Sequence, residues 1–154
     1  MITVKVQRED FDIGAELAAL SDGDTSVGGV ASFTGLVRDM GGPQDRDGQS
    51  SMTLEHYPGM TEKQLIAIAE EAAKRWPLAR LLIIHRYGKL LPGDRIVLVA
   101  TASAHREAAL ASCAFLIDWL KTKAPFWKLE DDGRTRNWVE AKDSDDKAAD
   151  RWRR

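Results

Sequence analysis

The sequence lacks the features that mark secreted, membrane-spanning and nucleic-acid-binding proteins. Its 154 residues include one cysteine, Cys113, which excludes an internal disulfide and fits a reducing compartment. The first residues do not form the continuous apolar core of a secretory signal, and no run approaches the roughly 18 apolar residues of a membrane span. The formal net charge of −2 argues against a large basic surface. We expect a cytoplasmic protein that binds neither membranes nor nucleic acid.

Common metal and nucleophile motifs are also absent. The three histidines show no metal-ligand spacing and no cysteine pair accompanies them, so no metal site is expected. There is no Walker loop, no Gly-x-Gly-x-x-Gly fingerprint and no Gly-x-Ser-x-Gly elbow. Cys113 lies on an apolar helical face, which favours a buried, inert thiol. His85, in an apolar strand, is interpreted as a core histidine, and His56 as structural or at the edge of a site.

The sequence does contain a series of short strands and amphipathic helices. Its length and its hydrophobic fraction of 44% suit one compact domain over residues 1–154. Strands and helices do not alternate strictly, so the fold class is predicted to be α+β. Strands are predicted at residues 1–6, 30–37, 52–57, 81–85, 95–102, 126–129 and 137–141, and helices at 13–20, 62–76, 104–122 and 145–152.

Capping and breaking residues set the expected boundaries. Asp12, Thr61 and Ser103 are predicted helix N-caps, and Thr61 with Gln64 has the spacing of a capping box. Gly35 inside a strand indicates a bulge or a close backbone approach. Residues 38–51 are polar and rich in glycine, so a flexible loop is predicted there. That loop is either an inert surface loop or one that orders on binding.

His105 and Arg106 stand where an apolar strand passes into a helix. The first-turn N–H groups of a helix lack internal partners and carry the positive end of its dipole, so they favour anions. Cationic side chains do not stabilise that end. Their presence suggests an anionic ligand, although a solvated pair at a helix start is an equally good explanation of this feature alone.

Lys121 and Lys128 flank a proline break at Ala124–Pro125. Two lysines facing one pocket could lower each other's pKa and allow acid–base chemistry, or they could hold anionic groups. Ordinary solvated lysines at a helix end are the favoured alternative when spacing alone is considered. Arg38, at the end of a predicted strand, could be a third basic group. The residues alone therefore predict a small anion pocket and no particular reaction.

Several stretches, taken together, resemble the molybdopterin synthase large-subunit family. They occur in the family's order and spacing and cover most of the chain, which makes a chance match improbable. The stretches are residues 33–38 (FTGLVR), 54–60 (LEHYPGM), 85–88 (HRYG), 92–94 (PGD), 103–106 (SAHR), 121–128 (KTKAPFWK) and 138–140 (WVE).

The resemblance implies an α/β-hammerhead fold with a mixed or antiparallel sheet that forms a homodimer. It implies a small ubiquitin-like partner subunit at each end of that dimer. The partner's C-terminal glycine thiocarboxylate would supply sulfur to cyclic pyranopterin monophosphate, and two transfers would give the dithiolene of molybdopterin. No bound cofactor is implied, because the sulfur arrives on the partner.

The resemblance also implies roles for individual residues. Lys121 and Lys128 match the pair closest to the chemistry, and Phe33 and Phe126 match positions around the inserted tail. The substrate-binding positions are Leu36, Val37, Arg38, His105, Arg106, Lys121, Lys128, Leu129 and Glu130.

Two of these positions depart from the family pattern, which often has a basic residue at Leu36 and at Leu129. Losing two positive charges would lower the affinity for an anionic substrate or change how the loop closes. Two alternatives stay open. One is a noncatalytic paralogue that keeps the partner groove, and the other is an unrelated phosphate-ester enzyme that uses His105 as its acid or base.

Overall fold

The computed structural model describes residues 1–39, 51–123, 126–131, 136–139, 147 and 150–153. For residues 123, 126–131 and 136–139 the description concerns the backbone alone. The predicted loop at 38–51 falls largely outside the described residues, as does part of the helix predicted at 145–152.

The main sheet has four strands in the order β1-β4-β6-β2. They are β1 (Ile2–Gln7), β4 (Leu78–Arg86), β6 (Arg95–Ser103) and β2 (Gly29–Leu36). β1 runs parallel to β4, and the other two pairings are antiparallel, so the prediction of a mixed sheet is confirmed. Strands β1 and β2 are therefore the edges of this sheet.

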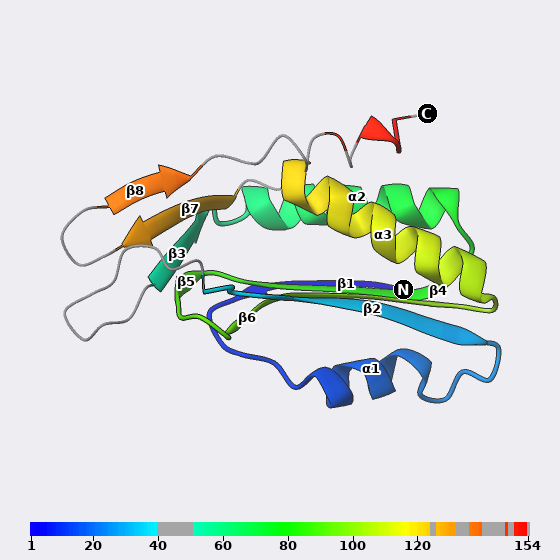
Figure 1. Cartoon of the computed structure of the whole chain (residues 1–154). Helices are drawn as coiled ribbons and strands as arrows, with labels where there is room; N and C mark the ends of the chain where they lie inside the picture. The colour runs from blue at the N-terminus through cyan, green and yellow to red at the C-terminus, as the bar shows by residue number, and fades with distance from the viewer. Residues whose placement is uncertain (40–50, 124–125, 132–135, 140–146, 148–149, 154) are drawn as a thin grey trace.

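A smaller antiparallel sheet projects from one end of the molecule (Figure 1). Its order is β5-β3-β7-β8, formed by β5 (Gly88–Leu90), β3 (Ser51–His56), β7 (Phe126–Asp131) and β8 (Arg136–Val139). The short strand β5 was not predicted from the sequence. Only one residue, Tyr87, separates it from β4. Because β5 has three residues, its apolar pattern is too short to be distinguished from the following turn.

Three helices cover the main sheet on both faces (Figure 1). Helices α2 (Met60–Arg75) and α3 (Arg106–Lys123) lie on one face, and α1 (Ile13–Ser21) lies on the other. The larger core forms under α2 and α3 around Leu65, Ile83, Val99 and Phe115, all of which are fully buried. Burial of such side chains contributes roughly 1.5–3 kcal/mol each, so this layer fixes α3 on the sheet.

The predicted helix starts were right once and wrong twice. Asp12 caps α1 by accepting a hydrogen bond from the N–H of Ala15 at 3.0 Å. Helix α2 begins earlier than predicted, and Glu62 accepts from the N–H of Gly59 at 2.6 Å, whereas Thr61 is fully buried. Ser103 does not cap α3, because its hydroxyl donates to the carbonyl of Pro77 at 2.8 Å and the helix begins at Arg106.

Gly35 is needed for the contact between β2 and β6. The register shifts between Gly35 and Leu36, and a Cβ at Gly35 would lie 2.7 Å from Cγ1 of the buried Val97. Both features predicted for this glycine, a bulge and a close approach, are confirmed. We expect Gly35→Ala to lower the free energy of unfolding by about 1–3 kcal/mol, since a stiff β-branched neighbour must move.

Gly14 provides the matched control for that measurement. It lies in α1, and a Cβ there would meet only Asp12 Oδ1 at an ordinary 3.5 Å. Gly14→Ala should therefore raise the free energy of unfolding by about 0.5–1 kcal/mol. Urea denaturation of both variants tests the pair, and equal effects of the two substitutions would contradict the packing argument.

Candidate functional site

The predicted site residues lie at two opposite ends of α3. Arg106 begins this helix, and Lys121 stands fifteen residues later in its last turn. At 1.5 Å per residue these positions are about 22 Å apart along the axis. Within one chain the structure therefore does not bring His105 and Arg106 to Lys121. We call the two regions the histidine end and the lysine end.

At the histidine end, the backbone before His105 is held from two sides. The N–H of Gly28 donates to the carbonyl of Ser103 at 2.9 Å, and the Ser103 hydroxyl bonds to Pro77. A Cβ at Gly28 would lie only 2.1 Å from the Ala104 carbonyl oxygen, so this approach requires glycine. The strand end is thus fixed, while His105 and Arg106 themselves are exposed at the helix start.

At the lysine end, strand β2 ends at Leu36, and two more of the predicted residues, Val37 and Arg38, follow it directly. Val37 is buried against Leu54 and Leu90. Its N–H donates to the Asp94 carbonyl at 2.8 Å, and its carbonyl accepts from Gly93 N–H at 2.7 Å. Val37 is therefore a fixed base for its neighbours, and its side chain faces the core. Leu36 and Arg38 on either side of it are exposed.

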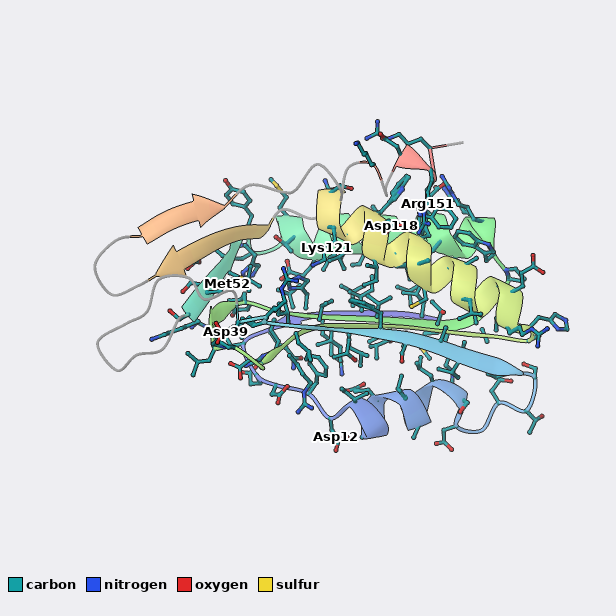
Figure 2. All side chains as sticks on the ribbon, in the orientation of Figure 1. Asp12, Asp39, Met52, Asp118, Lys121 and Arg151 are labelled. Carbon is teal, nitrogen blue, oxygen red and sulfur yellow. The ribbon has the colours of Figure 1, made fainter. Side chains whose placement is uncertain are left out.

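Lys121 and the end of β2 occupy the same end of the molecule. β2 starts beside Arg106, whose Cα lies 3.7 Å from an ideal Cβ on Gly29, and α3 packs along the strand from there. Figure 2 shows Lys121 near the end of α3 that is closer to Asp39, Met52 and the smaller sheet. The structure thus brings Leu36, Arg38 and Lys121 to one end.

Strand β7 carries the remaining predicted residues at this end. It pairs with β3 in the register Lys128↔Leu54 and Leu129↔Thr53, with Phe126 opposite His56 and Glu130 opposite Met52. The backbone of Lys128 is thereby placed in the sheet that adjoins the lysine end. The side chains of Phe126, Lys128, Leu129 and Glu130 lie outside the described residues.

Three of the basic side chains, His105, Arg106 and Lys121, have no counter-charge among the residues that the structure describes. Within the described ranges, no residue forms an ion pair or a side-chain hydrogen bond with His105, Arg106 or Lys121. Exposed cations with no internal counter-charge favour an anionic ligand. In the part of the chain that the structure describes, no group of three or more metal-ligating side chains converges.

An open apolar groove runs between β2 and α3, midway between the two ends. Its volume is about 550 Å³, and sequence reasoning did not anticipate it, apart from Phe33. Phe33, Val30 and Leu110 are all at least 40% exposed on or beside it. The groove is lined by Val30, Ala31, Ser32, Phe33, Leu110, Cys113, Ala114, Ile117 and Asp118.

Cys113 and His85 are buried, as predicted from the sequence, and His56, predicted to be structural or at the edge of a site, contacts Tyr87 and Glu62. Burial raises the pKa of the Cys113 thiol to about 11, so the thiol is neutral at physiological pH. His85 is buried, and its Nδ1 lies 2.8 Å from the Arg86 carbonyl oxygen. His56 stacks on Tyr87 with ring centroids 4.2 Å apart and lies 3.9 Å from Glu62. The Cys113 thiol and the His85 imidazole are therefore buried and are not exposed acids or bases.

Comparison with known families identifies the chain. The model of the MoaE protein family matches residues 6–123. The chain belongs to the MoaE family. A relative from Mesorhizobium japonicum, named molybdopterin synthase catalytic subunit, is 54% identical over 153 residues, covering 98% of this chain and 93% of the relative. One from Vibrio cholerae with the same name is 50% identical and covers 97% of each chain.

Solved structures of MoaE proteins share the fold. Molybdopterin cofactor biosynthesis protein E from Burkholderia multivorans has a TM-score of 0.83 at 51% identity, covering 99% of this chain and 97% of that one. A Helicobacter pylori complex of subunits 1 and 2 of molybdopterin-converting factor contains a chain with a TM-score of 0.71 at 20% identity, covering 89% and 90%. The second likeness shows the fold alone. Among the described helices of this MoaE chain, none is long and apolar enough to cross a membrane.

The state of Cys113 can be measured directly. Because its pKa is about 11 in the fold and 9.0 without burial, the thiolate fraction at pH 8 falls about a hundredfold on folding. Alkylation by iodoacetamide, followed by mass spectrometry, should be slower by at least that factor in the folded protein than in urea. It should accelerate as the pH rises toward 11. Equal rates in the two states would show a reactive thiol instead.

Proposed function

We propose that this chain is the catalytic subunit of molybdopterin synthase. It would transfer sulfur from the C-terminal thiocarboxylate of a small ubiquitin-like partner subunit to cyclic pyranopterin monophosphate, in two steps. Two facts support this proposal: relatives of that name are about half identical over nearly the whole chain, and the predicted basic residues are present. The designation "catalytic subunit" for those relatives itself implies a second subunit.

The proposed chemistry asks little of the chain's own reactivity. The partner supplies sulfur, so no cysteine nucleophile and no bound cofactor are needed, which agrees with the protonated, buried Cys113. The chain must bind the anionic substrate, hold the incoming tail and move protons. We assign phosphate and pterin binding to Arg38, His105 and Arg106. We propose that this reaction, between a metabolite and a carrier protein, takes place in the cytoplasm.

Lys121 and Lys128 are assigned to the reacting centre. The thiocarboxylate sulfur would attack a carbon of the pterin to form a C–S bond, and water would then cleave the acyl–sulfur bond, leaving sulfur on the pterin and a carboxylate on the partner. Both steps pass through states with extra negative charge on oxygen or sulfur. A nearby ammonium stabilises that charge and can donate or accept a proton. Phe33 and Phe126 would pack around the tail. Leu36, Leu129 and Glu130 would complete the pocket beside Arg38, with the Val37 backbone as a fixed part of its base.

The observation that carries the arrangement of the site is the 15-residue separation between Arg106 and Lys121 on one rigid helix. About 22 Å is farther than one small substrate can bridge. A second copy of the chain resolves the difficulty if it is placed antiparallel across the groove between β2 and α3. The histidine end of each copy then meets the lysine end of the other. The exposed edge of β2 and the apolar groove suit such an isologous contact.

The first test is product formation by the purified protein with a thiocarboxylated partner. Conversion of cyclic pyranopterin monophosphate to dithiolene should require the partner and fall by about 10²–10⁴-fold in Lys121→Ala and Lys128→Ala. Lys74→Ala, on the exposed side of α2, is the matched control and should retain activity. Partner binding without product in the wild type would indicate the noncatalytic paralogue. Hydrolysis of phosphate esters without any partner would indicate the His105 enzyme.

The second test asks whether the site is shared between copies. In a mixed dimer of Arg106→Ala and Lys121→Ala chains, a shared site leaves one intact centre, so about half of the wild-type rate should return. A dimer of wild type with the Arg106→Ala/Lys121→Ala double variant contains the same number of each residue. It should be inactive if the site is shared and half active if each chain builds its own site. Half of the wild-type rate in the dimer of wild type with the double variant would refute the antiparallel arrangement.

A further inference from the structure

Asp118 is the centre of a polar cluster that the proposed reaction does not explain. Its carboxylate oxygen Oδ2 accepts hydrogen bonds from Arg151 Nε at 3.0 Å, Arg151 Nη2 at 2.6 Å and Trp152 Nε1 at 2.5 Å. The Asp118 side chain is only 14% exposed, whereas Arg151 is 58% exposed. A half-buried carboxylate with three charged or polar donors is fixed much more firmly than a surface ion pair.

Residues 151 and 152 also contact α2 and α3, the two helices on one face of the main sheet. The Trp152 ring packs edge-on against Trp76, at 5.7 Å between centroids, and against Phe115, at 5.8 Å. Arg75, in the last turn of α2, donates from Nη1 to the Trp152 carbonyl at 2.6 Å. The Arg75 guanidinium also lies over the Phe115 ring at 4.8 Å. We call this assembly of Arg75, Asp118, Arg151 and Trp152 the clasp.

The clasp acts on the helical turn that leads to Lys121. Asp118 and Lys121 are three residues apart on α3, so they are neighbours on its surface. Figure 2 shows Asp118 beside Arg151, with Lys121 farther along the same helix toward its end. Thr122 adds a second constraint, because its hydroxyl bonds back to the carbonyls of Asp118 and Trp119, both at 3.3 Å. Leu120, which lies between Asp118 and Lys121 in the sequence, is buried in the core.

We propose that the clasp positions Lys121 for catalysis by holding the last turn of α3, with Trp152 as the key positioning residue. Helix ends fray unless a cap or a tertiary contact holds them, and α3 has its contact at Asp118, one turn before the lysine. The proposal rests on the assignment of Lys121 to the reacting centre. Trp152 touches neither substrate nor partner in this scheme, and its effect passes through Asp118 and the helix.

The geometry distinguishes positioning from general stability through two matched tryptophans. Trp152→Phe keeps an aromatic ring against Trp76 and Phe115 but removes the bond to Asp118. Trp76→Phe makes the same chemical change in the same aromatic cluster, and Trp76 makes no contact with the Asp118 carboxylate among those that hold it. Both variants should lower Tm by similar amounts.

The test uses the complete enzyme with its thiocarboxylated partner, well below the Tm of every variant. Trp152→Phe should lower kcat by about tenfold, because small displacements of a catalytic group are costly, and leave KM for the pterin phosphate within about twofold. Trp76→Phe should leave both constants near wild type. Hydrogen exchange should show faster exchange of the amides of residues 119–123 in Trp152→Phe only, with residues 109–113 unchanged.

Lys121→Ala, measured beside these variants, separates the two ways of failing. If Lys121→Ala abolishes sulfur transfer while Trp152→Phe keeps the wild-type kcat, the clasp is not a positioning device and the proposed function stands. If Trp76→Phe and Trp152→Phe lower kcat equally, the role of Trp152 is structural only. If Lys121→Ala itself keeps full activity, the assignment of Lys121 fails and the positioning proposal fails with it.

Discussion

The packing of α3 along the main sheet is the constraint on which the rest of the site depends. Phe115 and Leu116 of this helix are fully buried, and Leu120 is nearly so. Their packing prevents the helix from sliding or tilting on the sheet. A rigid helix fixes the distance between its ends. Because the chain places Arg106 at one end and Lys121 at the other, one copy cannot concentrate its basic residues around one small ligand. If both groups serve one site, as proposed above, the length of the helix requires that a second copy supply one of them.

The sequence predicted the elements well because their signals are local. Asp12 caps α1 because its carboxylate reaches an N–H three residues away, and Gly35 stands at a bulge because the alternating strand pattern is interrupted there. Ser103 failed as a cap because its hydroxyl has a partner 26 residues earlier, at Pro77, which no local pattern reveals. Thr61 failed as a cap because the helix starts two residues earlier, with Gly59 as its N-cap, and Thr61 is buried inside it.

The sequence predicts candidate residues for the site, but it does not predict how they are arranged in space. Family motifs pointed to His105, Arg106 and Lys121, but spacing in sequence does not say whether two groups face one pocket. The clasp was not foreseen either, since Asp118 and Trp152 are 34 residues apart and each is unremarkable alone. One local signal existed: an aspartate three residues before a lysine on one helix. That spacing alone favours an ion pair between Asp118 and Lys121, but the Asp118 carboxylate accepts hydrogen bonds from Arg151 instead.

The position of Leu36 bears on how much positive charge such a site needs. Its side chain is 56% exposed at the lysine end, close to Arg38, at a position where the family resemblance leads us to expect a basic residue. An exposed leucine there adds apolar surface, which suits a contact with a second chain better than a contact with phosphate. If the partner tail and a second copy both close over this end, they exclude water and lower the local dielectric constant. Each remaining cation then interacts more strongly with negative charge. Fewer charges can then stabilise the same anionic intermediate, so the leucine is compatible with catalysis by the lysines that remain.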